Sequence, residues 1–500
     1  NTNSSNGKTT TTKYEQFDGY GNPQKITQIV QTTKPTTQTY TKQSTYSYNN
    51  ITGGEHRLIG LVSSCSDKYI LGNNAITINT NYNYDNCGFM TQKVCNGIDE
   101  RYSRDSHGNT ISINRITDSG TRSETMTYSN DGRFLESHTD AMGNITSYQY
   151  INRNGLLRSV TDPNGLVTTY HYDMLENVTG IDYPDGTKEL FVKRWTIPFP
   201  SSGYTEHPDM PATGQSVYYT WSKRNGQPEV TSFFDQHNRL LRTVTTDFTG
   251  RKIYCDYTYY NKSGLLHTES LPYFNNEGQA AGVTAYSYDF LDRTTSISKP
   301  GYVQYTHSYN GNTETIHDFD GSTKTVKYAP NGLPYQITDN GTTIEYSYYG
   351  DGKIMSTKVG GNNNTKIEYT YDANRHPNTM SDPSLGLRTY SYNAFGELIS
   401  ETNNKGQTTN YSYDALGRMT SRTDEDGTTT WQYDQQMAGL LDCTVYEPTD
   451  SGEPSVRETF EYDQHGRLIH QNQLLSRENR PLEFTYEYNK YGQRKSITYP

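Results

Sequence analysis

A phrase that recurs along the chain constrains its fold more than any other feature of the sequence. The clearest copy spans residues 411–433 and reads Tyr-x-Tyr-Asp-x-x-Gly-Arg, then Asp-x-x-Gly, then Thr-x-Trp-x-Tyr. Successive copies are 22, 21 and 20 residues apart, measured from Tyr150 to Tyr172, from Tyr392 to Tyr413 and from Tyr413 to Tyr433. A repeat of this length indicates an array of small supersecondary units, not an enzyme domain built once.

Each unit predicts a β-hairpin followed by a second turn. Thr409, Tyr411 and Tyr413 occupy alternate positions, so in a strand they share one face. The Asp-x-x-Gly at 414–417 predicts a turn, because Asp bonds its own backbone two residues on and Gly accepts a positive φ. A second strand starts at Arg418, and a second Asp-x-x-Gly at 424–427 predicts the next reversal. Two strands and two tight turns fill one period.

The residues that define the repeat are predicted to be structural, with no catalytic, cofactor-binding or metal-binding role. They are Tyr148, Tyr150, Asp162, Gly165, Tyr170, Tyr172, Asp173, Tyr390, Tyr392, Gly396, Tyr411, Tyr413, Asp414, Gly417, Arg418, Asp424, Gly427 and Tyr433.

The predicted fold is all-β, a long antiparallel sheet of repeated hairpins with almost no helix, because helical apolar spacing is not sustained. We expect one domain over residues 1–500, with degenerate repeats at 1–109 and clear repeats at 110–500. An inserted loop is expected at about 196–220, where the prolines at 198, 200, 208 and 211 cannot donate to a strand ladder. We expect this loop to project from the sheet.

Composition bounds the function classes. Tyrosine supplies 46 of 500 residues, against 14 Phe and 3 Trp, so tyrosine rings are expected to do the packing that Leu and Val do in a compact core. The formal charge is −11 and the basic residues are scattered, which disfavours nucleic-acid binding. No apolar run is long enough to span a membrane. The first residues are polar, so we expect either a piece of a longer chain or export without an N-terminal signal here.

Five cysteines are present, and three of them lie close together in the sequence. A disulfide between Cys65 and Cys87, which are 22 residues apart, or between Cys87 and Cys95 is one expectation, and ordinary buried thiols are the other. The acidic turns at 182–186 and 424–427 hold carboxylates suited to Ca²⁺, but neither completes a calcium loop and turn chemistry explains them. No carboxylate pair is singled out for glycoside hydrolysis.

The Tyr-x-Tyr-Asp-x-x-Gly-Arg pattern resembles the tyrosine-aspartate (YD) repeat of the Rhs proteins, a family that includes the B and C subunits of bacterial Tc toxin complexes and the teneurins. The likeness covers most of 110–500. The stretches 234–241, 247–251 and 270–274 resemble the bacterial Rhs and Tc-subunit branch most. In that family the repeats spiral into a hollow β-shell that encloses a polypeptide, so the resemblance implies a spiralling shell (cocoon) here.

The resemblance implies a non-catalytic shell segment of an Rhs-type toxin or Tc-like complex, without cofactors, in a bacterial protein that is secreted or at the cell surface. Its partners would be an enclosed toxin or other cargo polypeptide, and further shell subunits or a secretion apparatus. The family's self-cleavage signature is not matched at 382–388, which fits an ordinary repeat turn. An alternative is a cell-surface adhesin that binds carbohydrate through exposed tyrosines or through the loop from Ile197 to Ala212.

Overall fold

The computed structural model describes residues 2–5, 8–33, 37–52, 57–151, 154–196, 207–211, 216–274, 282–478 and 480–500. These residues form 42 β-strands that belong to one sheet. The described part of the chain contains no α-helix, and η3 (Asn363–Thr365) is a single 3-10 turn. The prediction of an all-β fold with almost no helix is confirmed. No helix in these ranges is long and apolar enough to cross a bilayer.

The first half of the strands follows the chain from the N-terminus to the inserted loop and beyond. These strands are β1 (Thr2–Ser5), β2 (Lys8–Phe17), β3 (Pro23–Thr32), β4 (Gln38–Ile51), β5 (Leu58–Leu71), β6 (Asn74–Tyr84), β7 (Met90–Cys95), β8 (Ile98–Arg104), β9 (Thr110–Thr117), β10 (Gly120–Tyr128), β11 (Leu135–Thr139), β12 (Ile145–Ile151), β13 (Leu156–Thr161), β14 (Val167–Tyr172), β15 (Val178–Asp182), β16 (Lys188–Trp195), β17 (Tyr218–Arg224), β18 (Val230–Phe234), β19 (Leu240–Thr246), β20 (Lys252–Tyr259) and β21 (Leu266–Ser270).

The second half continues the same alternation of strands and turns. These strands are β22 (Tyr273–Phe274), β23 (Val283–Tyr288), β24 (Thr294–Ser298), β25 (Tyr305–Asn310), β26 (Thr313–His317), β27 (Thr323–Tyr328), β28 (Pro334–Asp339), β29 (Thr342–Tyr348), β30 (Ile354–Val359), β31 (Ile367–Tyr371), β32 (Pro377–Asp382), β33 (Gly386–Tyr392), β34 (Leu398–Thr402), β35 (Thr408–Tyr413), β36 (Met419–Thr423), β37 (Gly427–Tyr433), β38 (Leu441–Pro448), β39 (Val456–Tyr462), β40 (Leu468–Leu475), β41 (Leu482–Tyr488) and β42 (Arg494–Thr498).

Nearly every strand pairs antiparallel with the strands before and after it in the chain. The exception is at β20, whose one edge pairs with β19 while its other edge is shared by β21 and the short β22. The strand β21 then pairs with β23, and the simple order resumes to β42. The sheet is therefore one ribbon of consecutive hairpins, as the repeat predicts.

Hairpins that close with a Tyr-Asp turn carry a β-bulge. In β35 and β36, Ser412 pairs with Ser421 but the next residue, Tyr413, pairs with Met419, so one residue of β36 is left out of register. The same shift precedes Tyr172 in β14 and Tyr392 in β33. A bulge increases the local twist of a strand pair. Because the bulge recurs along the ribbon, the extra twist accumulates and curls the sheet.

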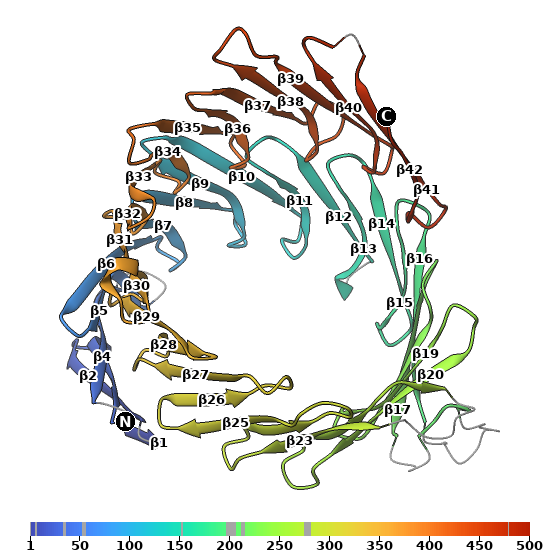
Figure 1. Cartoon of the computed structure of the whole chain (residues 1–500), viewed down its shortest axis with the longest axis horizontal. Helices are drawn as coiled ribbons and strands as arrows, with labels where there is room; N and C mark the ends of the chain where they lie inside the picture. The colour runs from blue at the N-terminus through green and yellow to red at the C-terminus, as the bar shows by residue number, and fades with distance from the viewer. Residues whose placement is uncertain are drawn as a thin grey trace.

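The ribbon winds into a ring and then continues over itself (Figure 1). Strands from the N-terminal third form the left side and top of the view, the middle third forms the right side and bottom, and the last third returns over the left side and top. The chain thus makes more than one circuit. This confirms the predicted spiral, and a flat, open sheet is excluded.

The wall of the ring is one sheet thick, which explains its burial pattern. Along β35 the side chains alternate between exposed and half-buried, and Tyr411 and Tyr413 lie on the half-buried face. Packing on that face comes from neighbouring strands of the same layer and not from a second layer. One cluster of fully buried hydrophobic residues stands out in the described ranges, and it comprises Phe233, Val244 and Tyr254 with Met210, Tyr219 and Tyr273 around them.

Candidate functional site

The Tyr-Asp turn is held by the aspartate that begins it. The Oδ1 atom of Asp414 accepts bonds from the backbone N–H groups of Leu416 (2.9 Å) and Arg418 (3.0 Å). The N–H of Gly417 donates to the carbonyl oxygen of Asp414, and Gly417 has a φ of +79°. The same pair of side-chain bonds recurs at Asp18, Asp85, Asp105, Asp140, Asp162, Asp173, Asp235, Asp247, Asp289 and Asp463.

The second tyrosine of the phrase ties each unit to the one before. The hydroxyl of Tyr413, at the end of β35, donates to the carbonyl oxygen of Leu398, at the start of β34, over 2.9 Å. The ladder between these strands begins only at Ser400, so the Leu398 carbonyl lies beyond it and gains its partner from the tyrosine. The equivalent bond is made by Tyr48, Tyr84, Tyr172, Tyr259, Tyr309, Tyr348, Tyr371, Tyr433, Tyr462 and Tyr488.

The arginine that ends the phrase links consecutive Tyr-Asp turns. The Nε atom of Arg418 donates to Asp414 in its own turn (2.7 Å), and its Nη1 atom donates to Asp434 in the next turn (2.9 Å). Its guanidinium also lies 4.5 Å from the ring centroid of Tyr433. The hydrogen bonds that Arg418 donates to Asp434 and to Asp414 raise the pKa of Arg418 further above its usual range. Arg239, Arg293 and Arg467 stack in the same way on Tyr259, Tyr309 and Tyr488.

The remaining predicted repeat residues lie in strands and turns of the same kinds. Tyr148 and Tyr150 are in β12, Tyr170 is in β14, and Tyr390 and Tyr392 are in β33. Tyr411 donates its hydroxyl to Glu401, and Tyr150 stacks on Phe134 with their ring centroids 5.0 Å apart. Asp162 and Gly165 form the turn between β13 and β14, and Gly396 has a φ of +86° in the turn after β33.

Gly427 differs from the other turn glycines. The reversal after Asp424 is complete one residue earlier, and Gly427 is a buried residue that begins β37 without a positive φ. A Cβ atom at this position would lie 2.4 Å from the carbonyl oxygen of Glu447 on β38. Glycine is therefore required at 427 by the close approach of a neighbouring strand, whereas at 417 it is required by backbone conformation.

The three clustered cysteines are free thiols, so neither expected disulfide forms. Cys65 lies within β5, while Cys87 lies in the turn between β6 and β7, so the two are not at equivalent positions of successive hairpins. Cys87 and Cys95 are at opposite ends of β7. Cys65 and Cys95 both pair with Thr80 from opposite sides, which leaves a whole strand between them. Burial raises the pKa of the Cys65 thiol to about 11.

The inserted loop is anchored to the sheet through a buried aspartate that the sequence reading missed. Residues 197–206 and 212–215, and with them most of the loop from Ile197 to Ala212, lie outside the described residues; His207–Pro211 pack onto the sheet instead of projecting from it. The carboxylate of Asp209 accepts bonds from Lys252 Nζ and from the Tyr254 hydroxyl, both over 2.6 Å. Arg242 donates to the Asp209 carbonyl oxygen (3.2 Å) and bonds Asp256.

Electrostatics at this anchor favour a charged Asp209. Burial by itself would raise the pKa of Asp209, but the bonds from Lys252 and Tyr254 outweigh it and the net pKa is lowered. Burial lowers the pKa of His207, which packs against Tyr219 and Phe233. Each polar group at the anchor therefore has a partner, and the arrangement fixes the loop onto β18 to β20. In the sequence, the Pro-Asp-Met-Pro run at 208–211 predicts only that a central strand cannot continue here.

A second feature that the sequence did not reveal is a seam, defined as the contacts between two sets of turns and the strand ends beside them: the turns that follow the odd-numbered strands β5 to β17, and those that follow the odd-numbered strands β29 to β41. Four contacts fix its register. Asn74 Nδ2 donates to Met355 Sδ, Ala394 N to Ser119 Oγ, Ala438 N to Asn164 Oδ1, and Gln493 Nε2 to the carbonyl oxygen of Gly226. The partners are 281, 275, 274 and 267 residues apart.

The seam gives the period of the spiral. Because β5 meets β29, β9 meets β33, β13 meets β37 and β17 meets β41, one circuit takes 24 strands. The overlap of the two circuits is also visible along the left side and top of Figure 1. The contacts join turn residues or, for Asn74 and Met355, residues at the start of the strand after a turn, so the two circuits meet edge to edge.

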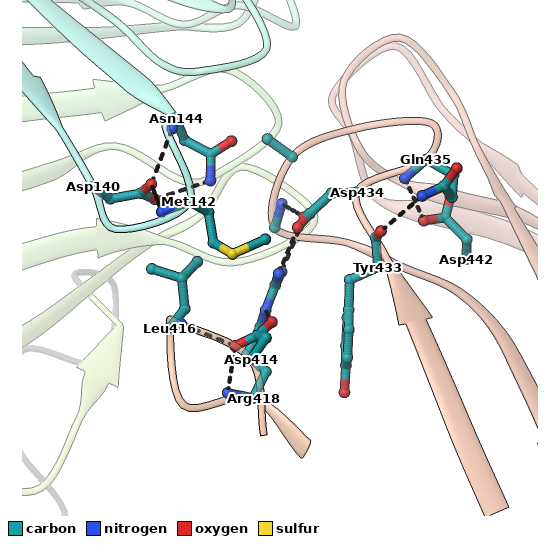
Figure 2. A network of polar contacts seen from close by, with 12 residues as sticks. Asp140, Met142, Asn144, Asp414, Leu416, Arg418, Tyr433, Asp434, Gln435 and Asp442 are labelled. Atoms are coloured by element: carbon teal, nitrogen blue, oxygen red, sulfur yellow. Dashed lines mark hydrogen bonds and ion pairs between the residues drawn. The ribbon is translucent and has the colours of Figure 1, made fainter. Parts of the chain in front are cut away.

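Figure 2 shows the seam between the turn after β11 and the turn after β35. Met142 projects from the first circuit toward Leu416 of the second, while Asp140 holds its own turn through Met142 and Asn144. Arg418 lies beside these two side chains and joins Asp414 to Asp434. The residues that define the repeat therefore also build the surface on which the circuits meet.

The acidic turn at 424–426 lines a pocket of about 170 Å³ together with Arg388 and Glu401. The backbone N–H of Asp426 donates to Asp424 Oδ1, so this carboxylate takes part in turn bonding. Within the residues that the structure describes, no group of three or more His, Cys, Asp or Glu side chains is arranged to hold a metal ion.

Comparisons with known proteins match both the repeat and the ring. A family model described as RHS Repeat matches residues 152–188 and 392–429. The tRNA nuclease WapA of Bacillus subtilis (strain 168) is 25% identical over 173 residues, which cover 34% of this chain and 7% of that protein. The same figures hold for the tRNA3(Ser)-specific nuclease WapA of Bacillus spizizenii. The matched segment thus spans a small fraction of these relatives.

Solved structures share the fold over nearly the whole chain. The crystal structure of TcdB2-TccC3-Cdc42 has a TM-score of 0.64 at 10% identity and covers 98% of this chain and 40% of that one. TcdB2-TccC3 without its hypervariable C-terminal region also has a TM-score of 0.64, and the Tc holotoxin pore of Photorhabdus luminescens has 0.53 at 13% identity, with 27% of that chain covered. This chain therefore contains two segments that match the RHS Repeat model, and its tyrosine-aspartate hairpins form a β-sheet shell fold similar to that of the TcdB2-TccC3 structures.

Proposed function

We propose that this chain is a non-catalytic wall segment of a shell that encloses a toxic or other cargo polypeptide, in an Rhs-type toxin or a Tc-like complex of a secreted bacterial system. The observation that carries the proposal is the closure of a single sheet through more than one 24-strand circuit. A sheet with this curvature has one face turned inward around its whole length. That face surrounds whatever chain occupies the ring.

Two properties of the wall suit a container. The repeat residues form the turns, the bonds between units and the ring stacking. Because these contacts are internal to the wall, its shape does not depend on a ligand. Strands such as β33 and β35 carry Thr, Ser and Tyr hydroxyls, and such polar side chains make few strong apolar contacts with an unfolded segment. The likeness to TcdB2-TccC3 supports the fold on which this function depends.

Site-specific photo-crosslinking tests enclosure directly. A benzophenone amino acid is placed at Thr409, on the half-buried face of β35, or at Asn410, on its opposite face, in the protein produced with its native partners. A third position, Lys405, is in an exposed turn at the edge of the wall and serves as the control.

A container predicts that one of the two faces crosslinks to a single polypeptide, that the other face does not, and that this polypeptide resists added protease until the wall is denatured. Crosslinking of neither face to a polypeptide would overturn the proposal. Capture of glycans or cell-surface proteins from the outward face or from Lys405, with no internal polypeptide, would favour the adhesin instead.

A further inference from the structure

The seam and the sheet are held together by different kinds of bond. Between neighbouring strands the backbone forms a continuous ladder, such as the four paired positions of β33 and β34. Across the seam the contacts come from side chains and turn atoms at 24-strand intervals. Separating the circuits would leave every ladder intact. The free energy needed to part the seam is therefore much smaller than that needed to unfold the wall.

Arg122 makes the strongest contact across the seam. From β10 its Nη2 atom donates to both carboxylate oxygens of Glu397, over 2.8 and 2.9 Å, and to the carbonyl oxygen of Asp414 over 3.1 Å. Its guanidinium lies 4.0 Å from the ring centroid of Phe395. In the described part of the chain, this is the ion pair that joins the two circuits; the other ion pairs there connect residues of the same circuit.

The second circuit is built to receive this arginine. Asn393 Nδ2 donates to Glu397 Oε2 over 2.7 Å, which orients the carboxylate, and the neighbouring Ala394 N–H bonds Ser119 of the first circuit. Gly417 faces the pair, because a Cβ atom there would lie 2.8 Å from Glu397 Oε1. The side chains of Arg122 and Glu397 are 19% and 14% exposed in the closed ring, so both charges gain water if the circuits part. Parting the circuits therefore replaces the contact between Arg122 and Glu397 with contacts between each of these charges and water.

We propose that the seam is an opening interface with Arg122 as its latch, so that the ring opens by parting of its two circuits while the hairpins stay folded. If the wall encloses a polypeptide, as proposed above, the seam is a route by which that chain leaves. The opening itself is a property of this chain and does not depend on cargo.

Hydrogen exchange of the purified chain measures the opening. The reporter amides are Ala394 and Ala438, whose N–H groups bond across the seam, and the reference amides are those of strands β33 and β37. Arg122→Ala is compared with Arg293→Ala. Arg293 is a matched control, since it also pairs with a carboxylate (Asp289) and stacks on an aromatic ring at 3.9 Å, but at the end of the turn between β23 and β24, away from the seam.

Loss of the latch is expected to raise exchange of the two reporter amides by at least about tenfold, while the reference strands keep their protection. Glu397→Gln is expected to act in the same direction, and Arg293→Ala to leave the reporters unchanged. A disulfide introduced by Ser119→Cys with Ala394→Cys is expected to suppress the opening in the Arg122→Ala background, as read at Ala438, the reporter amide that these two changes leave in place.

Two results would overturn the latch. One is unchanged exchange of Ala394 and Ala438 in Arg122→Ala, and the other is equal acceleration of reporters and reference strands, which would mean unfolding instead of parting. Because hydrogen exchange needs no cargo, the two tests are separate. If the seam opens but neither face crosslinks to a polypeptide, only the container is refuted; if a polypeptide crosslinks but the seam does not open, only the latch is refuted.

Discussion

At the scale of the residue, the contacts of the tyrosine that precedes the turn aspartate explain why this position of the repeat is tyrosine and not phenylalanine. Its ring packs on the half-buried face, and its hydroxyl satisfies a carbonyl that the strand ladder does not reach. Eleven units make this bond, so a contact worth little in one unit acts along the whole ribbon.

Tyr413→Phe is expected to destabilise its unit by about 1 kcal/mol, the usual cost of losing one neutral hydrogen bond that leaves a carbonyl unpaired. The measurement is hydrogen exchange in β34 and β35, because a 500-residue array does not unfold in one step. Tyr411→Phe is the comparison, since it removes a hydroxyl that bonds the side chain of Glu401 and leaves no backbone group unpaired. Equal effects of the two changes would contradict the assigned role.

Glycine substitutions separate backbone strain from the packing of the seam. Gly417 and Gly406 have similar φ values, +79° and +83°, so Ala at either site costs about 1 kcal/mol from conformation alone. A methyl group at 406 meets open space, while at 417 it meets the carboxylate of Glu397.

Gly417→Ala is therefore expected to lower the thermal stability of the wall and to loosen the seam, as Gly417→Val should do more severely, whereas Gly406→Ala lowers stability without touching the seam. Exchange at Ala394 distinguishes the two. The same response at both glycines would show that the 417 contact relaxes without consequence, and an unaltered Gly417→Val protein would refute the turn itself.

At the scale of the element, a turn that is held by an aspartate has a stability that depends on pH. In the turn between β19 and β20, a bond from the Thr249 hydroxyl, together with bonds from the backbone N–H groups of Arg251 and Thr249, outweighs the opposing effect of burial and lowers the pKa of Asp247 to about 2. A carboxyl whose pKa is depressed in the folded state stabilises that state above its unfolded pKa of about 3.9, and the stabilisation disappears as the pH falls through about 2.

Carboxyl ¹³C titration of the folded chain is expected to give Asp247 a midpoint near 2. Thr249→Ala removes the hydroxyl bond to Asp247 and is expected to move the titration midpoint up toward the ordinary aspartate value. The turn should then unfold at a higher pH on acidification. A midpoint near 3.9 in the unmodified protein would refute the bonding scheme of the turn.

The hairpins also carry the cause of the ring. The bulge before the second tyrosine lies on the same side of successive hairpins, and each one adds twist in the same sense. Curvature in the ribbon is therefore a sum of small, similar increments. The break at β20, where one strand edge is shared by β21 and β22, is an interruption in that series and coincides with the buried cluster beneath the inserted loop.

At the scale of the whole molecule, the ring predicts a particle with a low-density centre. Small-angle scattering of the purified chain is expected to give a distance distribution with the broad, late maximum of a hollow body, and electron cryomicroscopy is expected to show a wall one sheet thick that overlaps itself along the seam. The Arg293→Ala variant, whose change lies away from the seam, is expected to give the same shape as the unmodified chain. A solid rod or a flat ribbon would contradict the spiral and would direct attention to an adhesive array.

The sequence by itself determined the unit, and the tertiary structure decided the circuit. Strand alternation and the Asp-x-x-Gly turn were readable because they depend on residues two to four positions apart, as Asp414 shows with Leu416 and Arg418. Gly427 and the anchor at Asp209 were not readable, since a neighbouring strand and a folded-back loop set their environments. Least readable was the pairing of Arg122 with Glu397, 275 residues apart. That pairing depends on the accumulated curvature of 24 strands, to which every hairpin contributes and which no single hairpin specifies.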